Sequence, residues 1–221
     1  MKLTTVFLSL FVLLAPSLMV AQSNTSITQQ LQQADALLLE KKYTEALKLY
    51  ESCAEQGNGS ALAKLGVIYG EGFGVALDPQ KSIDYFKQSV EKNSALGLVW
   101  MSYYETPKKA EEYILRAVEL KETLKADAIS QNSLAYIYRS EYSGITDYKE
   151  AFKWSKQSMD GGYLGGLNNV GVLYFIGKGV KKDKDKAFEH FLKAAEEGYV
   201  HAQCNMGEHY YYEKDYKEAL K

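Results

Sequence analysis

Small and apolar residues recur at helical spacing on both sides of a glycine loop between residues 166 and 198. Before the loop, positions i, i+4, i+5 and i+8 hold Gly166, Val170, Gly171 and Tyr174. After the loop, an apolar stripe with spacings of four, three and one consists of Ala187, Phe191, Ala194 and Ala195. Each set falls on one face of an α-helix. The pattern therefore predicts two helices, and the glycines and alanines indicate that neighbouring helices approach closely.

The residues around these two helices have the chemistry of turns and caps. Gly177 and Gly179 suit a turn that needs positive φ or a close approach of the backbone. Asp183 is placed to cap the second helix by accepting a hydrogen bond from a backbone amide, and Gly198 follows its last turn as a C′ residue. We therefore expect a helical hairpin, and we expect a bulky side chain at Gly171 to overpack it.

Weaker copies of this hairpin follow one another along the chain. Residues 60–93 repeat it almost completely, and Asp78 before Pro79 is a good start for the second helix of that copy. The third copy lacks the glycine loop and has Thr106 and Pro107 instead. In the fourth, Ser155 stands where an aromatic residue is expected, so we expect the weakest helix contact there.

The copies divide the chain into six predicted units. Their approximate ranges are 27–57, 60–93, 94–120, 126–162, 166–198 and the incomplete 202–221. A repeat array normally ends in a complete capping unit with a polar outer face. We therefore expect that the chain is a fragment of a longer array or that its last helix is frayed.

The consensus of these units is A/G-x3-L/V-G-x2-Y-x2-G-x-G-V-x2-D-x2-K-A-x3-F-x2-A-A-x2-G. It resembles the Sel1-like repeat, a relative of the tetratricopeptide repeat. The resemblance implies an all-α, right-handed superhelical solenoid of helix-turn-helix repeats over residues 27–221, with the first helix of each unit lining a concave face. It also implies a non-enzymatic scaffold that binds a protein or peptide along that face.

The register of tetratricopeptide relatives indicates which side chains face inward. The candidate partner-binding residues are Met101, Tyr104, Asn132, Tyr136, Arg139, Asn168, Val172, Phe175, Glu208 and Tyr211. Amides can bond to a peptide backbone, and aromatic residues and arginine are common anchors at interfaces. The alternative for each aromatic residue is packing against an adjacent helix.

Composition narrows the choice of partners. The chain has 221 residues, 46% of them hydrophobic and 24% charged, and a net charge of −2. Such a chain is ordinary for a soluble protein and has no basic excess for nucleic acid or an anionic membrane. Its 18 tyrosines exceed what the repeat requires and favour a binding surface. The oligomeric state and the identity of the partner stay open.

The first residues predict a signal peptide over residues 1–21. Lys2 is a short charged region, and the apolar run that follows is too short to span a membrane. Cleavage after Ala21 would leave Gln22 first, and cleavage after Ser23 is the alternative; residues 22–26 are a polar stretch. We expect an exported protein without a membrane span, periplasmic or secreted.

The two cysteines and the histidines offer one alternative function. Cys53 and Cys204 lie about four units apart in the predicted register, too far for a disulfide bond. His201, Cys204 and Glu208 are spaced i, i+3 and i+7, so a metal- or thiol-dependent activity on one helix face is a second hypothesis. Since no CxxC or HExxH motif accompanies them, we expect no metal and no cofactor.

Enzymatic activity has little support in the sequence. Neither a G-x-S-x-G motif nor an S-x-x-K motif with K-T-G is present. Some cysteine-rich relatives of the repeat family are described as β-lactamase-like, which makes a hydrolase a third hypothesis by analogy. Those relatives carry a cysteine pair in each unit, and this chain does not. We therefore expect a binding protein without catalytic residues.

Overall fold

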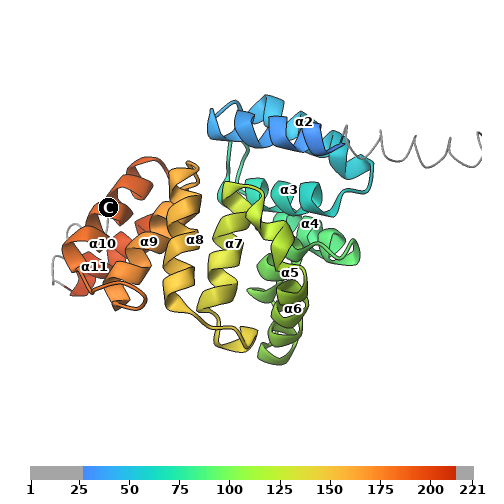
Figure 1. Ribbon diagram of the computed structural model, residues 1–221. Coiled ribbons are helices and arrows are strands. Elements are labelled where there is room, and N and C mark those ends of the chain that lie inside the picture. The colour runs from blue at the N-terminus through green and yellow to red at the C-terminus, as the bar shows by residue number, and fades with distance from the viewer. Residues whose placement is uncertain (1–26, 213–221) are drawn as a thin grey trace, which may run out of the picture.

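A computed structural model of the chain describes residues 27–212, without the side chains of residues 208, 209, 211 and 212. Within this range the secondary structure is helical and includes no strand, which confirms the all-α fold (Figure 1). Residues 27–39 are helical. The helices that follow are α2 (Tyr43–Glu55), α3 (Gly59–Glu71), α4 (Pro79–Glu91), α5 (Ala95–Ser102), α6 (Pro107–Glu119), α7 (Ala128–Arg139), α8 (Tyr148–Asp160), α9 (Leu164–Ile176), α10 (Lys184–Glu196) and α11 (Val200–Tyr212).

Each helix packs against the next one along the chain, from α2 to α6 and again from α7 to α11. Contact between α6 and α7 is slight, and the 3₁₀ helix η1 (Lys121–Lys125) fills this junction by packing against α5 and α7. A second 3₁₀ helix, η2 (Glu141–Ser143), lies between α7 and α8. The chain is thus a helical-repeat solenoid whose regular stacking is interrupted after the third hairpin.

The predicted caps are confirmed. Asp183 accepts a hydrogen bond from the Lys186 amide at 3.0 Å at the start of α10. Asp78 does the same for α4, where Pro79 is the first helical residue. Gly198 has a φ of 90° just after α10 ends. These local signals fix the helix ends because each satisfies polar backbone groups that the helix itself cannot pair.

Two glycines let aromatic rings pack between paired helices. A Cβ atom at Gly171 would lie 2.7 Å from the Phe191 ring, and one at Gly66 would lie 2.5 Å from the Phe86 ring. Both rings are buried. The close approach predicted at Gly171 is therefore present.

The expected weak contact at Ser155 was wrong. Ser155 is buried and donates a hydrogen bond to the Ala151 carbonyl oxygen at 2.8 Å. The repeat has Ala135 in α7 where it has Gly66 in α3 and Gly171 in α9. A larger residue on the first helix offsets a smaller one on the second, and α7 and α8 are among the most extensively packed helix pairs.

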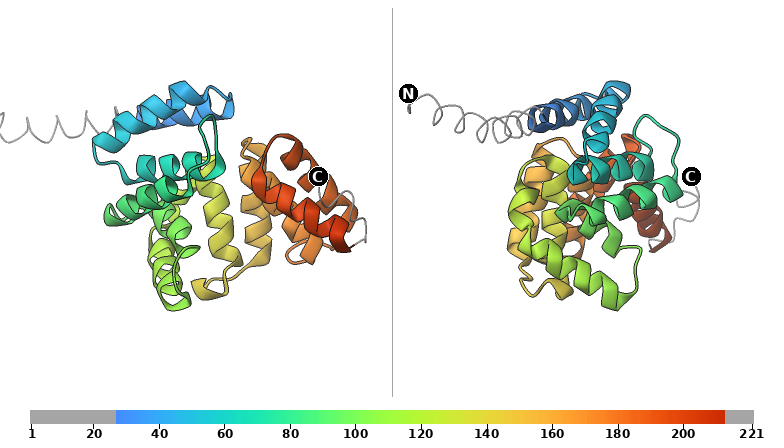
Figure 2. Two further views of the ribbon diagram at one scale, coloured as in Figure 1. Left: turned by 180° about the vertical axis from the view of Figure 1, so that it is seen from behind. Right: turned by 90° about the vertical axis from the view of Figure 1, so that its right-hand side faces the viewer.

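The first hairpin is tied to the middle of the solenoid by a buried ion cluster. Lys64 of α3 contacts Asp35 at 2.5 Å and Asp127, the N-cap of α7, at 2.9 Å. The Lys64 side chain is only 3% exposed, and Tyr50 donates a hydrogen bond to Asp35 at 2.6 Å. Figure 2 shows the first hairpin, in blue, lying across the top of the array.

Burial and charge compete within this cluster. Burial alone would lower the pKa of Lys64, but Asp127 and Asp35 outweigh it and raise the pKa. Burial raises the pKa of Asp35. For Asp127, burial is outweighed by Lys64 and by hydrogen bonds from Ser130, so its pKa is lowered. The ammonium group is thus held in its charged form by two carboxylates.

Part of the chain lies outside this description. Residues 1–26, which contain the predicted signal peptide, and residues 213–221 are not described. Among the helices that are described, none combines the length and the apolar character needed to cross a bilayer.

Candidate functional site

Side chains from α5, α7, α9 and α11, together with residues beside α5 and α11, surround a groove of about 460 Å³. Each of these four helices is the first helix of a predicted unit. The residues that line the groove are Trp100, Tyr103, Tyr104, Asn132, Arg139, Asn168, Asn169, Val172, Tyr199, His201, Cys204 and Asn205. Amides and aromatic rings dominate the set. This groove is the candidate site.

Two asparagine pairs repeat along the groove. Asn169 donates through Nδ2 to Asn132 Oδ1 at 2.7 Å, and Asn205 donates through Nδ2 to Asn168 Oδ1 at 2.7 Å. In both pairs the donor lies 37 residues after the acceptor, so one repeat bonds to the next in the same way. The pairs join α7 to α9 and α9 to α11.

Each pair leaves one donor and one acceptor for a ligand. Asn132 and Asn168 are 8% and 7% exposed, and their Nδ2 atoms have no hydrogen-bond partner among the described residues. Both asparagines line the groove. The Oδ1 atoms of Asn169 and Asn205 likewise have no donor among the described side chains. A peptide unit also offers one donor and one acceptor.

Aromatic rings and a guanidinium form one wall of the groove. Tyr103 and Tyr104 follow α5 and are about half exposed. The Tyr103 ring lies 4.5 Å from the ring of Tyr136, and the Arg139 guanidinium lies 5.7 Å from the centre of the Tyr136 ring. This stacking fixes the position of a cation at the edge of the groove.

The groove also contains a polar atom without a partner. Trp100 stacks on Phe86 with ring centres 5.5 Å apart. Its Nε1 atom is buried and has no hydrogen-bond partner among the described residues. A buried donor without an acceptor is costly and is uncommon in folded proteins.

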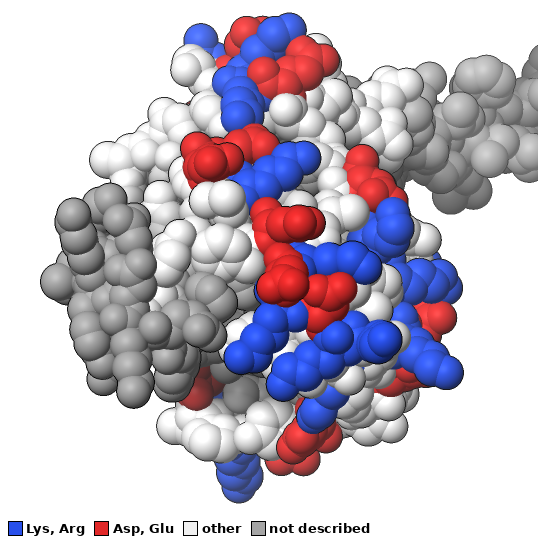
Figure 3. All heavy atoms as spheres, turned by 90° about the vertical axis from the view of Figure 1, so that its left-hand side faces the viewer, with Lys and Arg blue, Asp and Glu red and all other residues white. Residues whose placement is uncertain are grey.

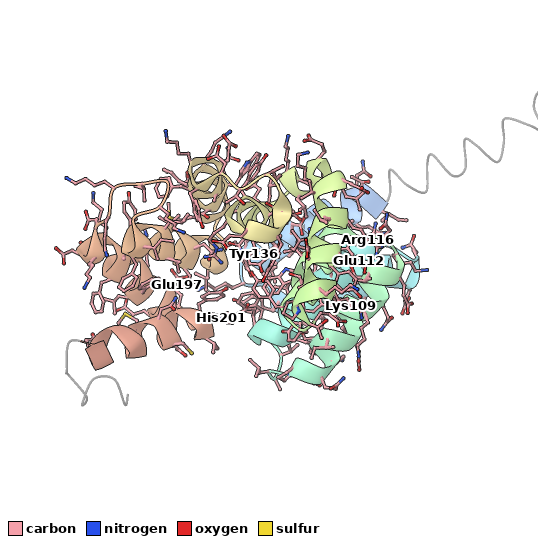
Figure 4. The ribbon with its side chains drawn as sticks, turned by 90° about the horizontal axis from the view of Figure 1, so that it is seen from below. Lys109, Glu112, Arg116, Tyr136, Glu197 and His201 are labelled. Carbon is pink, nitrogen blue, oxygen red and sulfur yellow. The ribbon has the colours of Figure 1, made fainter. Side chains whose placement is uncertain are left out.

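The two ends of the solenoid meet beside the groove. His201 Nε2 of α11 lies 3.6 Å from Glu71 Oε1 of α3, and Glu71 has a side chain only 3% exposed. The contact with Glu71 raises the pKa of His201. Nearby, Lys41 and Glu197 form an ion pair at 3.2 Å. Figure 4 shows Tyr136 and His201 near the centre of the molecule, where the later helices face the earlier ones.

A second cavity, of about 410 Å³, lies between residues 35–39, α7 and the end of α8. Its walls include the apolar side chains of Leu38, Leu39 and Ile129, and Asp35 and Asp127 of the ion cluster also border it. None of the residues predicted to bind a partner lines this cavity. The groove therefore remains the candidate site.

Comparison with known proteins identifies the repeat. The sequence model of the Sel1 repeat matches residues 36–58, 59–94, 128–163, 165–199 and 200–221, well over half of the chain. The chain belongs to the Sel1 repeat family. The matched segments leave out residues 95–127, which contain the shortened hairpin of α5 and α6.

Curated relatives share the repeat over part of their length. Protein sel-1 homolog 2 of Rattus norvegicus is 36% identical over an alignment of 182 residues that covers 73% of this chain and 26% of the rat protein. The human protein of the same name is 36% identical over an alignment of 184 residues that again covers 73% of this chain and 26% of the relative. This Sel1 repeat protein therefore spans about a quarter of the length of these relatives.

Solved structures of Sel1 repeat proteins are also similar to it. One is a protective antigen present in uropathogenic Escherichia coli strains that displays an SLR fold; the two are 29% identical, with a TM-score of 0.39, over 87% of this chain and 43% of that one. Another is a Sel1 repeat protein from Oxalobacter formigenes, 23% identical with a TM-score of 0.39 over 83% of this chain and 78% of that one.

The structure brings together half of the predicted partner-binding residues of this Sel1 repeat protein. Those that line the groove are Tyr104, Asn132, Arg139, Asn168 and Val172. Tyr136 lies behind the groove wall through its ring contact with Tyr103. Phe175 is exposed on the last turn of α9, near Lys184, and does not line the groove. The side chains of Glu208 and Tyr211 lie outside the described residues.

The assignment of Met101 to an accessible face was wrong. Met101 is 2% exposed and belongs to the hydrophobic core of the first hairpins. Val67, which occupies the same repeat position in α3, is buried too. In the later repeats this position holds Tyr136 and Val172, which are half-buried. The early helices are therefore covered on their inner side as well.

The metal hypothesis finds only part of its residues in place. His201 is directed to Glu71, and Cys204 is an exposed free thiol. The side chain of Glu208 lies outside the described residues, and within those residues no group of three His, Cys, Asp or Glu side chains is placed to hold a metal ion. The hypothesis stays a prediction.

Several groove residues were missed in the sequence. Asn169 directly follows the predicted inward residue Asn168, and Asn205 stands at the corresponding position of the next unit. Trp100 stands where other repeats have glycine or alanine, an exchange that also marks it. The contact between His201 and Glu71 has no such signal because it joins repeats that are distant in the sequence.

Proposed function

We propose that this Sel1 repeat protein is an exported, non-enzymatic interaction scaffold that holds an extended segment of a partner protein in its groove. The observation that supports this most strongly is the pair of equivalent asparagine bonds, Asn132 with Asn169 and Asn168 with Asn205. Their free donors and acceptors recur at the spacing of one repeat. A peptide backbone can bond to such a row whatever its sequence, and side chains then select the partner.

Aromatic residues at the groove also support a binding function. Tyr103 and Tyr104 line the groove and each exposes about half of its surface. Tyrosine provides contact area at a low cost in conformational entropy and can also form hydrogen bonds. Shallow contacts of this kind, spread over four helices, suit a long ligand better than a small molecule.

A random peptide library tests the binding function. Residues 22–221 would be used to select peptides, and the affinity of synthetic copies would be measured by fluorescence anisotropy. We expect Asn132→Ala with Asn168→Ala to weaken binding about tenfold or more, because two hydrogen bonds to the ligand are lost. Methylating the backbone nitrogens of the peptide should weaken binding in the same way.

A control variant removes two glutamine side-chain amides that lie outside the groove. Gln80 and Gln88 are exposed on α4 and do not line the groove. The double change Gln80→Ala with Gln88→Ala should leave the affinity unchanged. If no peptide is selected, or if the asparagine variant binds as well as the control while both are folded by circular dichroism, the groove is not a peptide site.

Export is tested separately. The full chain would be expressed in a bacterial host, the cells would be fractionated, and the N-terminal residue of the recovered protein would be identified by mass spectrometry. We expect a periplasmic protein that begins at Gln22. Recovery of the unprocessed chain from the cytoplasm would overturn this part of the proposal.

A further inference from the structure

The charged side chains of the groove are all basic. Arg139 and His201 line it, and no aspartate or glutamate does so among the described residues. Counted by lysine, arginine, aspartate and glutamate alone, the whole chain has 26 basic and 28 acidic residues, whereas the described lining of the groove has one basic residue and no acidic one. Elsewhere the two signs are interspersed, as the face shown in Figure 3 illustrates. The groove therefore differs from the rest of the surface in its charge.

The two basic residues of the groove differ in whether a carboxylate lies close to them. His201 faces the buried carboxylate of Glu71 at 3.6 Å, so a positive charge on its ring is already matched. Arg139 has no carboxylate within 4 Å among the described side chains. Its guanidinium is held against the Tyr136 ring instead. Many lysines on the outer helices do have partners, such as Lys153 with Glu150 on α8.

The choice of arginine at this position is informative. The chain contains two arginines among 26 basic residues, and the other is Arg116 on the outer helix α6. Arg116 bonds to the amide oxygen of Asn93 at 3.0 Å. An arginine offers a planar fork of donors that fits a carboxylate with two parallel bonds, and stacking on an aromatic ring keeps the fork oriented.

The neighbouring polar atoms also favour an acceptor-rich ligand. Asn132 and Asn168 line the groove and are more than nine-tenths buried, and the Nδ2 atom of each has no partner among the described residues. With Arg139, these groups form a row of donors on two successive inner helices, α7 and α9.

We propose that the segment bound in the groove carries a carboxylate and that Arg139 binds this group. The inference rests on the proposed function, because it names the chemistry of the peptide that the asparagine pairs hold. The carboxylate comes from an aspartate or glutamate side chain or from the C-terminus of the partner. Both sources present the same two oxygen atoms to the guanidinium.

Arrays of random octapeptides would test this inference. One array is attached through the C-terminus, so that only side-chain carboxylates remain, and the other is attached through the N-terminus and leaves the terminal carboxylate free. Each would be probed with the mature wild-type protein and with the variants Arg139→Gln, Arg139→Glu and Arg116→Gln. Thermal melts would confirm that every variant is folded.

The expected result is a selection for acidic ligands that depends on Arg139. The wild type and Arg116→Gln should select peptides with aspartate or glutamate, or should bind the array with free C-termini. Arg139→Gln should lose this preference, and Arg139→Glu should select lysine or arginine. Removing the carboxylate from the best peptide should weaken its binding to the wild type about tenfold, and should not weaken its binding to Arg139→Gln.

Other outcomes would overturn the inference in distinguishable ways. If peptides bind without acidic preference and Arg139→Gln changes nothing, Arg139 is not the carboxylate site, although the proposed function survives. If an acidic preference persists in Arg139→Gln, another residue binds the carboxylate. If the wild type binds no peptide, the proposed function fails as well.

A Glu208→Gln background removes one internal competitor. Glu208 was predicted to face inward, and its side chain lies outside the described residues. The acidic preference should be the same in this background. An acidic preference that emerged only after this change would mean that a carboxylate of the chain itself occupies Arg139, and the inference would be wrong.

Discussion

The helices up to α7 and the helices from α9 to α11 share one repeat pattern, but they are held together differently. The first group builds one large hydrophobic core, which contains Tyr50, Phe86, Met101 and Leu134. Among the described residues, helices α9 to α11 contain two small clusters, one around Tyr199 and the other around Phe191 and Met206. Hydrophobic stabilisation grows with buried apolar area, so stability is expected to be concentrated in the first group.

The groove lies at the boundary between these regions. One wall comes from α5 and α7 of the large core, and the other comes from α9 and α11 of the small clusters. A partner in the groove would therefore contact a rigid wall and a less strongly held one. The sequence of a repeat therefore determines the fold of its hairpin, whereas the neighbouring repeats determine how much of its inner face is buried.

The largest predicted effect concerns the ion cluster of the first region. Lys64→Met should lower the free energy of unfolding by about 3 to 5 kcal/mol, because Asp35 and Asp127 would be left buried without a counter-charge. Urea denaturation of the mature protein measures this. The deficit should shrink on acidification, since protonation relieves two unpaired carboxylates.

An exposed lysine provides the control for this change. Lys156 on α8 pairs with Asp160 at 2.9 Å, and both side chains are more than half exposed. Lys156→Met should change the free energy of unfolding by less than about 0.5 kcal/mol. If Lys64→Met is as stable as Lys156→Met, the first hairpin is not held by the ion cluster.

A smaller effect is expected in the second region. Gly171→Leu should cost about 1 to 3 kcal/mol by overpacking, because even a Cβ atom at this position would lie 2.7 Å from the Phe191 ring. Thermal melts and hydrogen exchange measure the change, and protection should fall in α9 and α10 while α3 keeps its protection. Adding Phe191→Ala should restore part of the loss. An unchanged melting midpoint would contradict the packing.

The smallest effect concerns the contact that joins the regions. The pKa of His201 is raised from 6.5 by Glu71, so this contact stabilises the protein fully below pH 6.5 and the stabilisation is lost as pH rises through the folded-state pKa. Hydrogen exchange of α11 should therefore quicken, beyond the intrinsic effect of pH, as the pH rises from about 6 to 8. The effect should be small because His201 is largely exposed.

Removing either partner tests this pH dependence. Both His201→Gln and Glu71→Gln should abolish the additional change in exchange between the same pH values. His190, which stacks on Tyr174 in the second region, should not produce it, so His190→Gln serves as the control. If His201→Gln keeps the pH dependence of the wild type, the contact does not couple the two regions.

The candidate site was only partly predictable from the sequence. Inward positions were recognised at Asn132, Arg139 and Asn168 because helical periodicity determines which side chains share a face. Asn169 and Asn205 lie one residue further around the helix and reach the groove only because each bonds to the preceding repeat. Met101 shows the opposite error, since an inward position was closed by packing.

The local architecture of this Sel1 repeat protein follows from its sequence. Helix ends follow from caps such as Asp78 and Asp183, and the close pairing of α9 with α10 follows from Gly171, because these signals act within one hairpin. The contact between α3 and α11 and the ion pairs of Lys64 with Asp35 and Asp127 are evident only from the tertiary structure. Such contacts depend on the rotation accumulated over several repeats and on the shortened third hairpin, and no single repeat encodes that sum.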